Sequence, residues 1–99
     1  VSTSERALIF IEAELYHEGT TSSEAIASYA VSGASNLAAS DSKGLKKESQ
    51  GTTLTKFRYG TSCIENGLTP GSNTFTMQYK SNNTLDAWFR YRRITVIPL

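Results

Sequence analysis

The sequence predicts an all-β fold: an antiparallel, jelly-roll-like β-sandwich of six to eight short strands, built as a single domain over residues 1–99. Side chains alternate strictly between apolar and polar from Thr74 to Lys80, which is the two-residue period of a strand buried on one face. Leu85 to Ile97 is a longer run that is rich in aromatic and β-branched residues. Turn residues such as Pro70 and Gly71 separate these stretches. Together these features favour a sandwich or barrel over a helical domain.

The first half of the chain is expected to contain three strands. In the first, Arg6 to Tyr16, alternate side chains form two faces: Ala7, Ile9, Ile11, Ala13 and Leu15 on one, and Leu8, Phe10, Glu12, Glu14 and Tyr16 on the other. Because both faces are apolar in the first half of this strand, we expect burial on both sides there. Glu24 to Ser32 is expected to form the second strand, and a short helix over Ser22 to Val31 is the alternative, because Ser-Ser-Glu-Ala resembles the N-capped start of a helix. A short strand is expected at Leu45.

The second half of the chain is expected to contain three longer strands. Its elements in order are the strand Leu54 to Ile64, a turn over Glu65 to Ser72, the strand Thr74 to Lys80, a hairpin-like connection at 81–84 and the strand Leu85 to Ile97. The last strand changes phase, because its early aromatic residues and its late aliphatic residues fall on opposite parities. A β-bulge near Arg92 and Arg93 reconciles the two phases. The predicted core includes Ile9, Ile11, Phe57, Phe75, Met77 and Ile94.

The composition limits the classes of function. A net charge of +1 does not suit a strongly basic nucleic-acid binder, and it disfavours an Sm-like RNA-binding barrel. Residues 1–41 carry a net charge of −5 and residues 42–99 a net charge of +6, so the two halves are expected to pair within one fold or between subunits. A single cysteine allows no internal disulfide, and we expect neither a membrane span nor a signal peptide from the apolar pattern.

The sequence contains no pattern that indicates an enzyme, a metal site or a cofactor. His17 is the only histidine and has no further ligands at a metal-binding spacing, so we interpret it as a loop residue. Cys63 lies in an alternating strand, which favours a small buried side chain over a nucleophile. Glu12 and Glu14 share a strand face about 7 Å apart, and paired carboxylates can hydrolyse glycosides. A solvated face that pairs with lysine and arginine on neighbouring strands is the favoured interpretation.

The richest candidate contact surface is the run from Trp88 to Arg93, which mixes aromatic rings and guanidinium groups. Such a run is typical of a stacking platform for glycans or single-stranded nucleic acid, of an interface between subunits, and of a core strand with cation–π contacts. The interface is the favoured of these three interpretations. The candidate interface or ligand-contact residues are Leu8, Phe10, Trp88, Arg90, Tyr91, Arg92 and Arg93.

Several stretches together resemble a known group of domains. They are Arg6 to Ile9, Tyr29 to Asp41, and the pair Gly67-Leu-Thr-Pro-Gly-Ser-Asn-Thr-Phe-Thr76 and Arg92-Arg-Ile-Thr-Val-Ile-Pro-Leu99. In these residues the chain resembles the small C-terminal β-sandwich domains of bacteriophage and prophage tail, fibre and surface proteins, a jelly-roll or TNF-like group. A Leu-x-x-Gly-x-x-x-Phe turn and a terminal Arg-Arg strand that ends in Val-Ile-Pro-Leu are the recurring features of that group.

The resemblance implies a non-enzymatic structural component on the surface of a virion, either a capsid decoration or head-fibre subunit or the tip of a tail fibre. It implies assembly with copies of itself, expected to be a trimer, and with other virion proteins. It brings no active-site motif, and we expect no cofactor, no nucleic acid and no inserted membrane segment. The alternative function is a module that binds a host glycan or another host receptor. The Trp88 to Arg93 run is richer in aromatic residues than the group, which makes this strand the candidate site of particular contacts.

Overall fold

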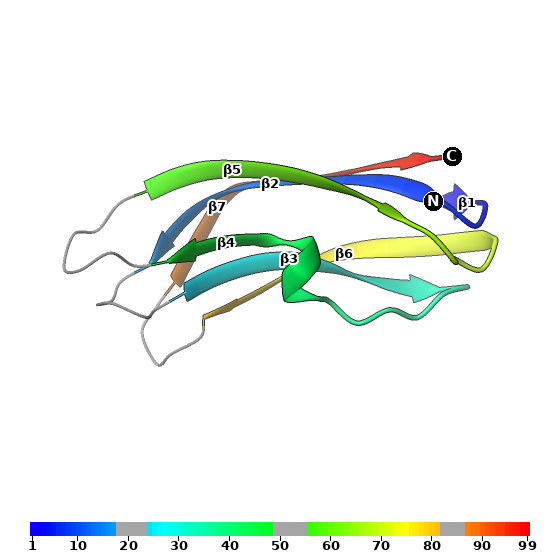
Figure 1. Ribbon diagram of the computed structural model, residues 1–99, viewed down its shortest axis with the longest axis horizontal. Coiled ribbons are helices and arrows are strands. Elements are labelled where there is room, and N and C mark those ends of the chain that lie inside the picture. The colour runs from blue at the N-terminus through cyan, green and yellow to red at the C-terminus, as the bar shows by residue number, and fades with distance from the viewer. Residues whose placement is uncertain (18–23, 49–55, 82–86) are drawn as a thin grey trace.

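The computed structural model describes residues 1–17, 24–48, 56–81 and 87–99, which form two antiparallel sheets packed face to face (Figure 1). The predicted all-β sandwich is confirmed. The described elements are β1 (Ser2–Thr3), β2 (Ala7–His17), β3 (Glu24–Gly33), the 3-10 turn η1 (Asp41–Lys43), β4 (Leu45–Glu48), β5 (Lys56–Glu65), β6 (Gly71–Ser81) and β7 (Ala87–Pro98). No helix among these residues is long and apolar enough to cross a membrane.

One sheet has four strands in the order β1-β6-β3-β4, and the other has three in the order β5-β2-β7. The most apolar strand, β2, occupies the centre of the three-stranded sheet, where it pairs with β5 on one side and β7 on the other. The molecule is elongated, with extents of 46 × 20 × 16 Å. Its radius of gyration of 14.6 Å exceeds the roughly 13 Å of an average 100-residue domain.

The core lies between the two sheets. Ile9 and Ile11 are buried as predicted, and they pack with the other inward residues of β2 against the inward face of β3. Phe75, Met77 and Ile94 also pack against this core, but they remain half-buried because they lie near the side of the sandwich where β6 and β7 end the sheets. The side chain of Phe57 falls outside the described residues.

The strand expected from Glu24 to Ser32 is confirmed, since Glu24–Gly33 pairs with both β4 and β6, and the alternative of a short helix is excluded for these residues. Two other expectations about the strands need correction. The connection at 81–84, of which 82–84 lie outside the described residues, is not a hairpin, because β6 and β7 belong to different sheets. The prediction that both faces of β2 are buried is wrong for the single chain. On the second face Leu8 is half-buried and Phe10 is 42% exposed.

An outward residue of β3, Ile26, is buried by the segment that follows this strand in the chain. Ser28 Oγ, on the same face, donates a hydrogen bond of 2.7 Å to the carbonyl of Ser40. Leu37 exchanges two backbone hydrogen bonds of 2.9 Å with Val31. These contacts hold the segment against the four-stranded sheet, so the outer face of the three-stranded sheet is the barer of the two.

The predicted bulge exists in β7, at Tyr91 and Arg92. Glu12 lies opposite Arg93 and Glu14 lies opposite Arg90, so β7 takes three steps where β2 takes two. Tyr91 has a φ of 53°, the left-handed conformation that accommodates such an extra residue. This conformation costs a non-glycine residue roughly 1–2 kcal/mol. The bulge changes the phase of β7 and decides which of its side chains face outward.

Both chain ends lie at one pole of the long axis (Figure 1). Val1 and Asn73 exchange two hydrogen bonds through their backbone groups, of 2.9 and 2.8 Å. At the other end of the chain, the carbonyl of Leu99 accepts a hydrogen bond of 2.7 Å from Ser4 Oγ, and its N–H donates to the carbonyl of Arg6. The two termini are therefore both tied into the fold at the same pole.

Candidate functional site

The outward side of the three-stranded sheet, called the outer face below, gathers most of the candidate contact residues. The register of β2 places Leu8, Phe10, Glu12 and Glu14 in successive rows along this face. Opposite the outward positions of β2 lie five residues of β7, which are Trp88, Arg90, Arg93, Thr95 and Ile97. Of the seven predicted residues, Leu8, Phe10, Trp88, Arg90 and Arg93 therefore share one surface.

The end of the outer face nearest the termini is apolar. Leu8 lies between Ile64 of β5 and Ile97 of β7, which are 47% and 44% exposed, and Phe10 occupies the next row. Adjacent strands are about 4.8 Å apart, so this apolar row crosses about 10 Å of the sheet. Ile64 and Ile97 were not among the predicted contact residues. The sequence did contain a signal for them, because Ile64 is an even number of residues from Arg58, and Ile97 from Arg93, which places each isoleucine on the same strand face as its arginine.

The middle of the outer face is charged. Arg90 donates two hydrogen bonds to Glu14 Oε1, from Nη2 at 2.7 Å and from Nε at 3.1 Å. This pair is the contact expected between the basic second half and the acidic first half, and it forms within one chain. The hydrogen bond with Glu14 raises the pKa of Arg90 above its usual value, so the guanidinium stays charged at every accessible pH.

Tyr91 is the most exposed aromatic side chain among the described residues, at 60%. Its ring lies between two guanidinium groups, with Arg58 of β5 at 4.6 Å from the ring centroid and Arg90 at 5.4 Å. Both distances fall within the range of cation–π attraction. The left-handed backbone at the bulge thus places the ring on the outer face beside Arg90, where a regular strand would have turned it inward.

The same bulge separates Arg92 from the other candidate residues. Its guanidinium lies 5.4 Å from the ring centroid of Tyr79 on β6, which belongs to the opposite sheet. The predicted cluster of Arg90, Arg92 and Arg93 is therefore divided: two members lie on the outer face, and Arg92 lies at the side of the sandwich.

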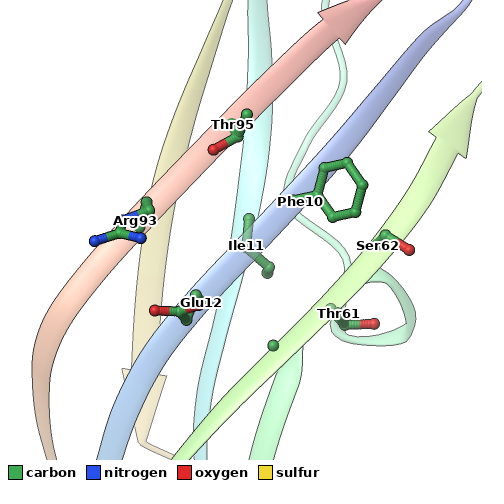
Figure 2. A pocket seen from close by; sticks show the side chains of 8 residues that line it. Phe10, Ile11, Glu12, Thr61, Ser62, Arg93 and Thr95 are labelled. Carbon is green, nitrogen blue, oxygen red and sulfur yellow. The ribbon is translucent and has the colours of Figure 1, made fainter.

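A shallow groove of about 430 Å³ crosses the centre of the outer face (Figure 2). It forms where Gly60 of β5, opposite Glu12, leaves a side chain's space empty. Glu12 and Arg93 lie across from each other on neighbouring strands at this groove, and among the described residues neither makes an ion pair. Phe10, beside them, points toward Ser62 of β5 (Figure 2). The groove therefore offers one carboxylate, one guanidinium and one aromatic ring to a partner.

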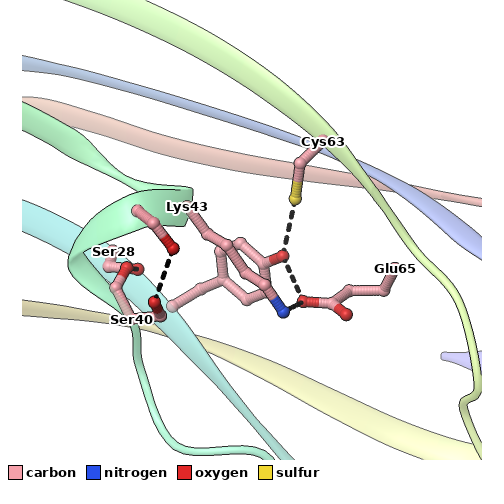
Figure 3. A network of polar contacts seen from close by, with 7 residues as sticks. Ser28, Ser40, Lys43, Cys63 and Glu65 are labelled. Atoms are coloured by element: carbon pink, nitrogen blue, oxygen red, sulfur yellow. Dashed lines mark hydrogen bonds and ion pairs between the residues drawn. The ribbon is translucent and has the colours of Figure 1, made fainter.

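A second polar cluster lies between the sheets and was not predicted (Figure 3). The hydroxyl of Tyr29 donates to Glu65 Oε1 at 2.7 Å and lies 2.7 Å from Cys63 Sγ, while Lys43 Nζ lies 2.6 Å from the same carboxylate oxygen. Burial, followed by the hydrogen bonds with Cys63 and Glu65, raises the pKa of Tyr29 far above its usual value. Cys63 is half-buried as part of this cluster, so it is not simply a small apolar side chain. The cluster fastens β3 to β5, which are in different sheets.

In the described part of the chain, no group of three or more His, Cys, Asp or Glu side chains is arranged to hold a metal ion. His17 is the last residue of β2, and its side chain lies outside the described residues. Comparison of the chain with protein-family models, curated proteins and solved structures gives no match.

Proposed function

We propose that this domain is a non-enzymatic structural subunit of a bacteriophage particle, which acts by assembling with copies of itself on the virion surface. The assembly part of the proposal is supported by the outer face, and above all by the adjacent exposed side chains of Phe10, Ile64 and Ile97. The assignment to a phage particle, as a capsid decoration, head-fibre or tail-fibre subunit, rests on the resemblance to phage surface domains. That resemblance is carried mainly by the turn before β6 and by the last strand.

The outer face has the composition of an interface. Its apolar end supplies side chains that gain free energy when a partner removes them from water, at about 25 cal/mol for each Å² of apolar surface. Tyr91 and Arg90 are of the residue types that dominate the binding energy of protein interfaces. Glu12 and Arg93 present opposite charges side by side, so two copies can satisfy each other's groups across a shared contact.

The experiment is a measurement of mass in solution by sedimentation, with one variant and one matched control. The 10.8 kDa chain should sediment as a homo-oligomer at tens of micromolar, with a trimer of about three times that mass as the expected species. Phe10→Ser should shift the population toward smaller species. Leu37→Ser is the control, because Leu37 is similarly exposed, at 38%, but belongs to the segment that covers the other sheet.

A strictly monomeric unmodified protein at these concentrations would contradict the proposal. So would a Phe10→Ser protein whose mass distribution matches that of the Leu37→Ser protein, because the outer face would then contribute nothing to association.

The stacked ring of Tyr91 favours one alternative, a module that binds a host glycan or another host receptor. An exposed aromatic ring between two arginines, with the indole of Trp88 41% exposed on the same strand, suits sugar rings and their hydroxyl or acidic groups. Tyr91→Ala combined with Arg93→Ala distinguishes the two functions. If this double variant assembles normally but no longer binds host envelope polysaccharide, the receptor-binding function replaces assembly.

A further inference from the structure

The edge strand β6 is only partly covered. On one side it pairs with β3 from Asn73 to Ser81. On the other side it pairs with β1 at Gly71 and Ser72, and the last backbone contact there is the exchange between Asn73 and Val1. Beyond Asn73, no described residue pairs with this side of β6.

The hydrogen bonds that β6 makes show which of its backbone groups point toward the side without a strand partner. The N–H and C=O of Asn73 both point to the β1 side, since both bond Val1. The carbonyl of Ser72 points the other way, because it accepts a hydrogen bond from Ala34, the residue that follows β3. Alternate residues of an antiparallel strand point their groups in the same direction. The N–H and C=O groups of Phe75, Met77 and Tyr79 therefore point outward at an edge with which no described strand pairs.

The side chains of the same three residues are left half-exposed. Their partners across β3, which are Val31, Tyr29 and Ala27, are fully buried in the core. Phe75, Met77 and Tyr79 face the same core but are only half-buried, even though the ring of Tyr79 packs on Phe89 of β7 at 4.8 Å between centroids. The sandwich is thus incomplete along β6, in its backbone pairing and in its apolar packing alike.

The sequence of β6 itself lacks the features that prevent edge strands from pairing, and the charged group near its edge is Arg92 of β7, at 5.4 Å from the ring centroid of Tyr79 at one end of the edge. From Thr74 to Tyr79 it contains no charged residue, no proline and no glycine. By contrast, the two edge strands of the three-stranded sheet have such protective features. β7 has its bulge and Pro98, and β5 carries the charged Arg58. Flat, uncharged edge strands with high β-propensity are the ones that join another strand.

We propose that β6 pairs with β6 of a second copy of this chain, antiparallel and about a two-fold axis that passes beside Met77. In this register Met77 lies opposite the partner's Met77, and Phe75 lies opposite the partner's Tyr79. The outward N–H and C=O groups of these residues then bond each other, and the aromatic rings form cross-strand pairs.

The solvent-facing residues of β6 fit the same register. Thr76 lies opposite the partner's Gln78, and Thr74 lies opposite the partner's Lys80, so no like charges meet. Lys80 is already held by Asp41, at 3.1 Å. The pairing runs from Thr74 to Lys80 and ends before Asn73, whose N–H and C=O already bond Val1, so the two four-stranded sheets join along this stretch into one sheet. This contact does not use the outer face, so it is independent of the assembly proposed above, and where both contacts form they give species larger than the outer-face trimer.

The first test compares Met77→Pro with Met77→Ala. Proline at position 77 removes an N–H that has no strand partner within the described chain, and proline is tolerated at such edge positions. Alanine removes the same side chain but keeps the N–H. In a Phe10→Ser background, which isolates this contact, we expect Met77→Pro to weaken the dimer at least tenfold relative to Met77→Ala, by sedimentation. Equal dimerisation of the two variants would overturn the proposal, as would a monomeric Phe10→Ser parent.

The second test does not depend on whether the proline variant folds. Opposed residues of a hydrogen-bonded antiparallel pair have Cα atoms about 5.5 Å apart, a separation that suits a disulfide. In a Cys63→Ser background, Met77→Cys should therefore form a covalent dimer on mild oxidation. Gln78→Cys is the control, because position 78 faces the partner's Thr76 and not its own copy. If Gln78→Cys cross-links as fast as Met77→Cys, the proposed register is wrong.

Discussion

Replacing Tyr29 with phenylalanine tests the polar cluster between the sheets. The change removes one hydroxyl and hardly alters the volume of a side chain that is 3% exposed. The lost hydrogen bond runs to a carboxylate, and such bonds contribute about 1.5–3 kcal/mol. Lys43 keeps its contact with Glu65, so we expect the free energy of unfolding at pH 7 to fall by about 2 kcal/mol. For a domain of this size that corresponds to a melting temperature lower by about 10 °C.

The pH dependence makes the test specific to Tyr29. In the unfolded chain a tyrosine ionises near pH 10, whereas in the fold the pKa of Tyr29 is raised by burial and by its hydrogen bonds. The folded state therefore keeps a proton that the unfolded state loses, and stability falls as the pH rises above about 10. At pH 11 this loss amounts to about 1.4 kcal/mol in the unmodified protein. The Tyr29→Phe variant has no hydroxyl at this position, so it does not share the loss.

The assay is urea unfolding followed by circular dichroism at pH 7, 9, 10 and 11. The stability difference between the unmodified protein and Tyr29→Phe should stay near about 2 kcal/mol up to pH 9 and narrow to about 0.6 kcal/mol at pH 11. Ser28→Ala is the control, since it also removes a buried hydroxyl with a hydrogen bond, to the carbonyl of Ser40, but one that does not titrate in this range. A Tyr29→Phe difference that is constant from pH 7 to 11 would refute the reasoning.

Two further predictions concern β6. Asn73 is fully buried, accepts a hydrogen bond from the N–H of Ser35 at 2.8 Å and donates one to Thr3 Oγ1 at 2.8 Å. Asn73→Ala removes both bonds, so it should lower the free energy of unfolding, measured by urea titration, by about 2–3 kcal/mol. Retention of full stability would contradict the assigned network. Phe75→Ala should cost about 2–3 kcal/mol, less than a fully buried phenylalanine, while Thr76→Ala on the other face should cost under about 0.5 kcal/mol. A loss below about 1 kcal/mol for Phe75→Ala would mean that the phase of β6 is wrong.

The local features of the strands were predictable because the pattern that encodes them is local. The alternation of β2 identified Ile9 and Ile11 as core residues, and both are buried. The change of parity in the last strand predicted a bulge near Arg92 and Arg93, which the structure has at Tyr91 and Arg92. An inserted residue has to appear in the sequence as a shifted period, so the bulge could be located almost to the residue.

The neighbour relations of the strands were not predictable, because alternation contains no information about which strands pair. The hairpin expected after β6 failed for this reason, since β6 and β7 belong to different sheets. The buried network of Asn73 leaves no signal in the sequence, because the Thr3 hydroxyl and the backbone N–H of Ser35, which bond its side chain, are distant along the chain. The candidate site was partly predicted: Phe10 and Arg90 share the outer face, whereas the bulge directs Arg92 elsewhere.

The position of the two chain ends has a practical consequence for every experiment above. Val1 and Leu99 lie at the same pole of a molecule 46 Å long, while the free edge of β6 between Thr74 and Tyr79 runs away from that pole. A label, a surface tether or a fused protein attached at either end is therefore carried at a single point. An attachment at that pole leaves the β6 edge accessible, whereas it lies close to the apolar end of the outer face, where Ile97 is only two residues from Leu99.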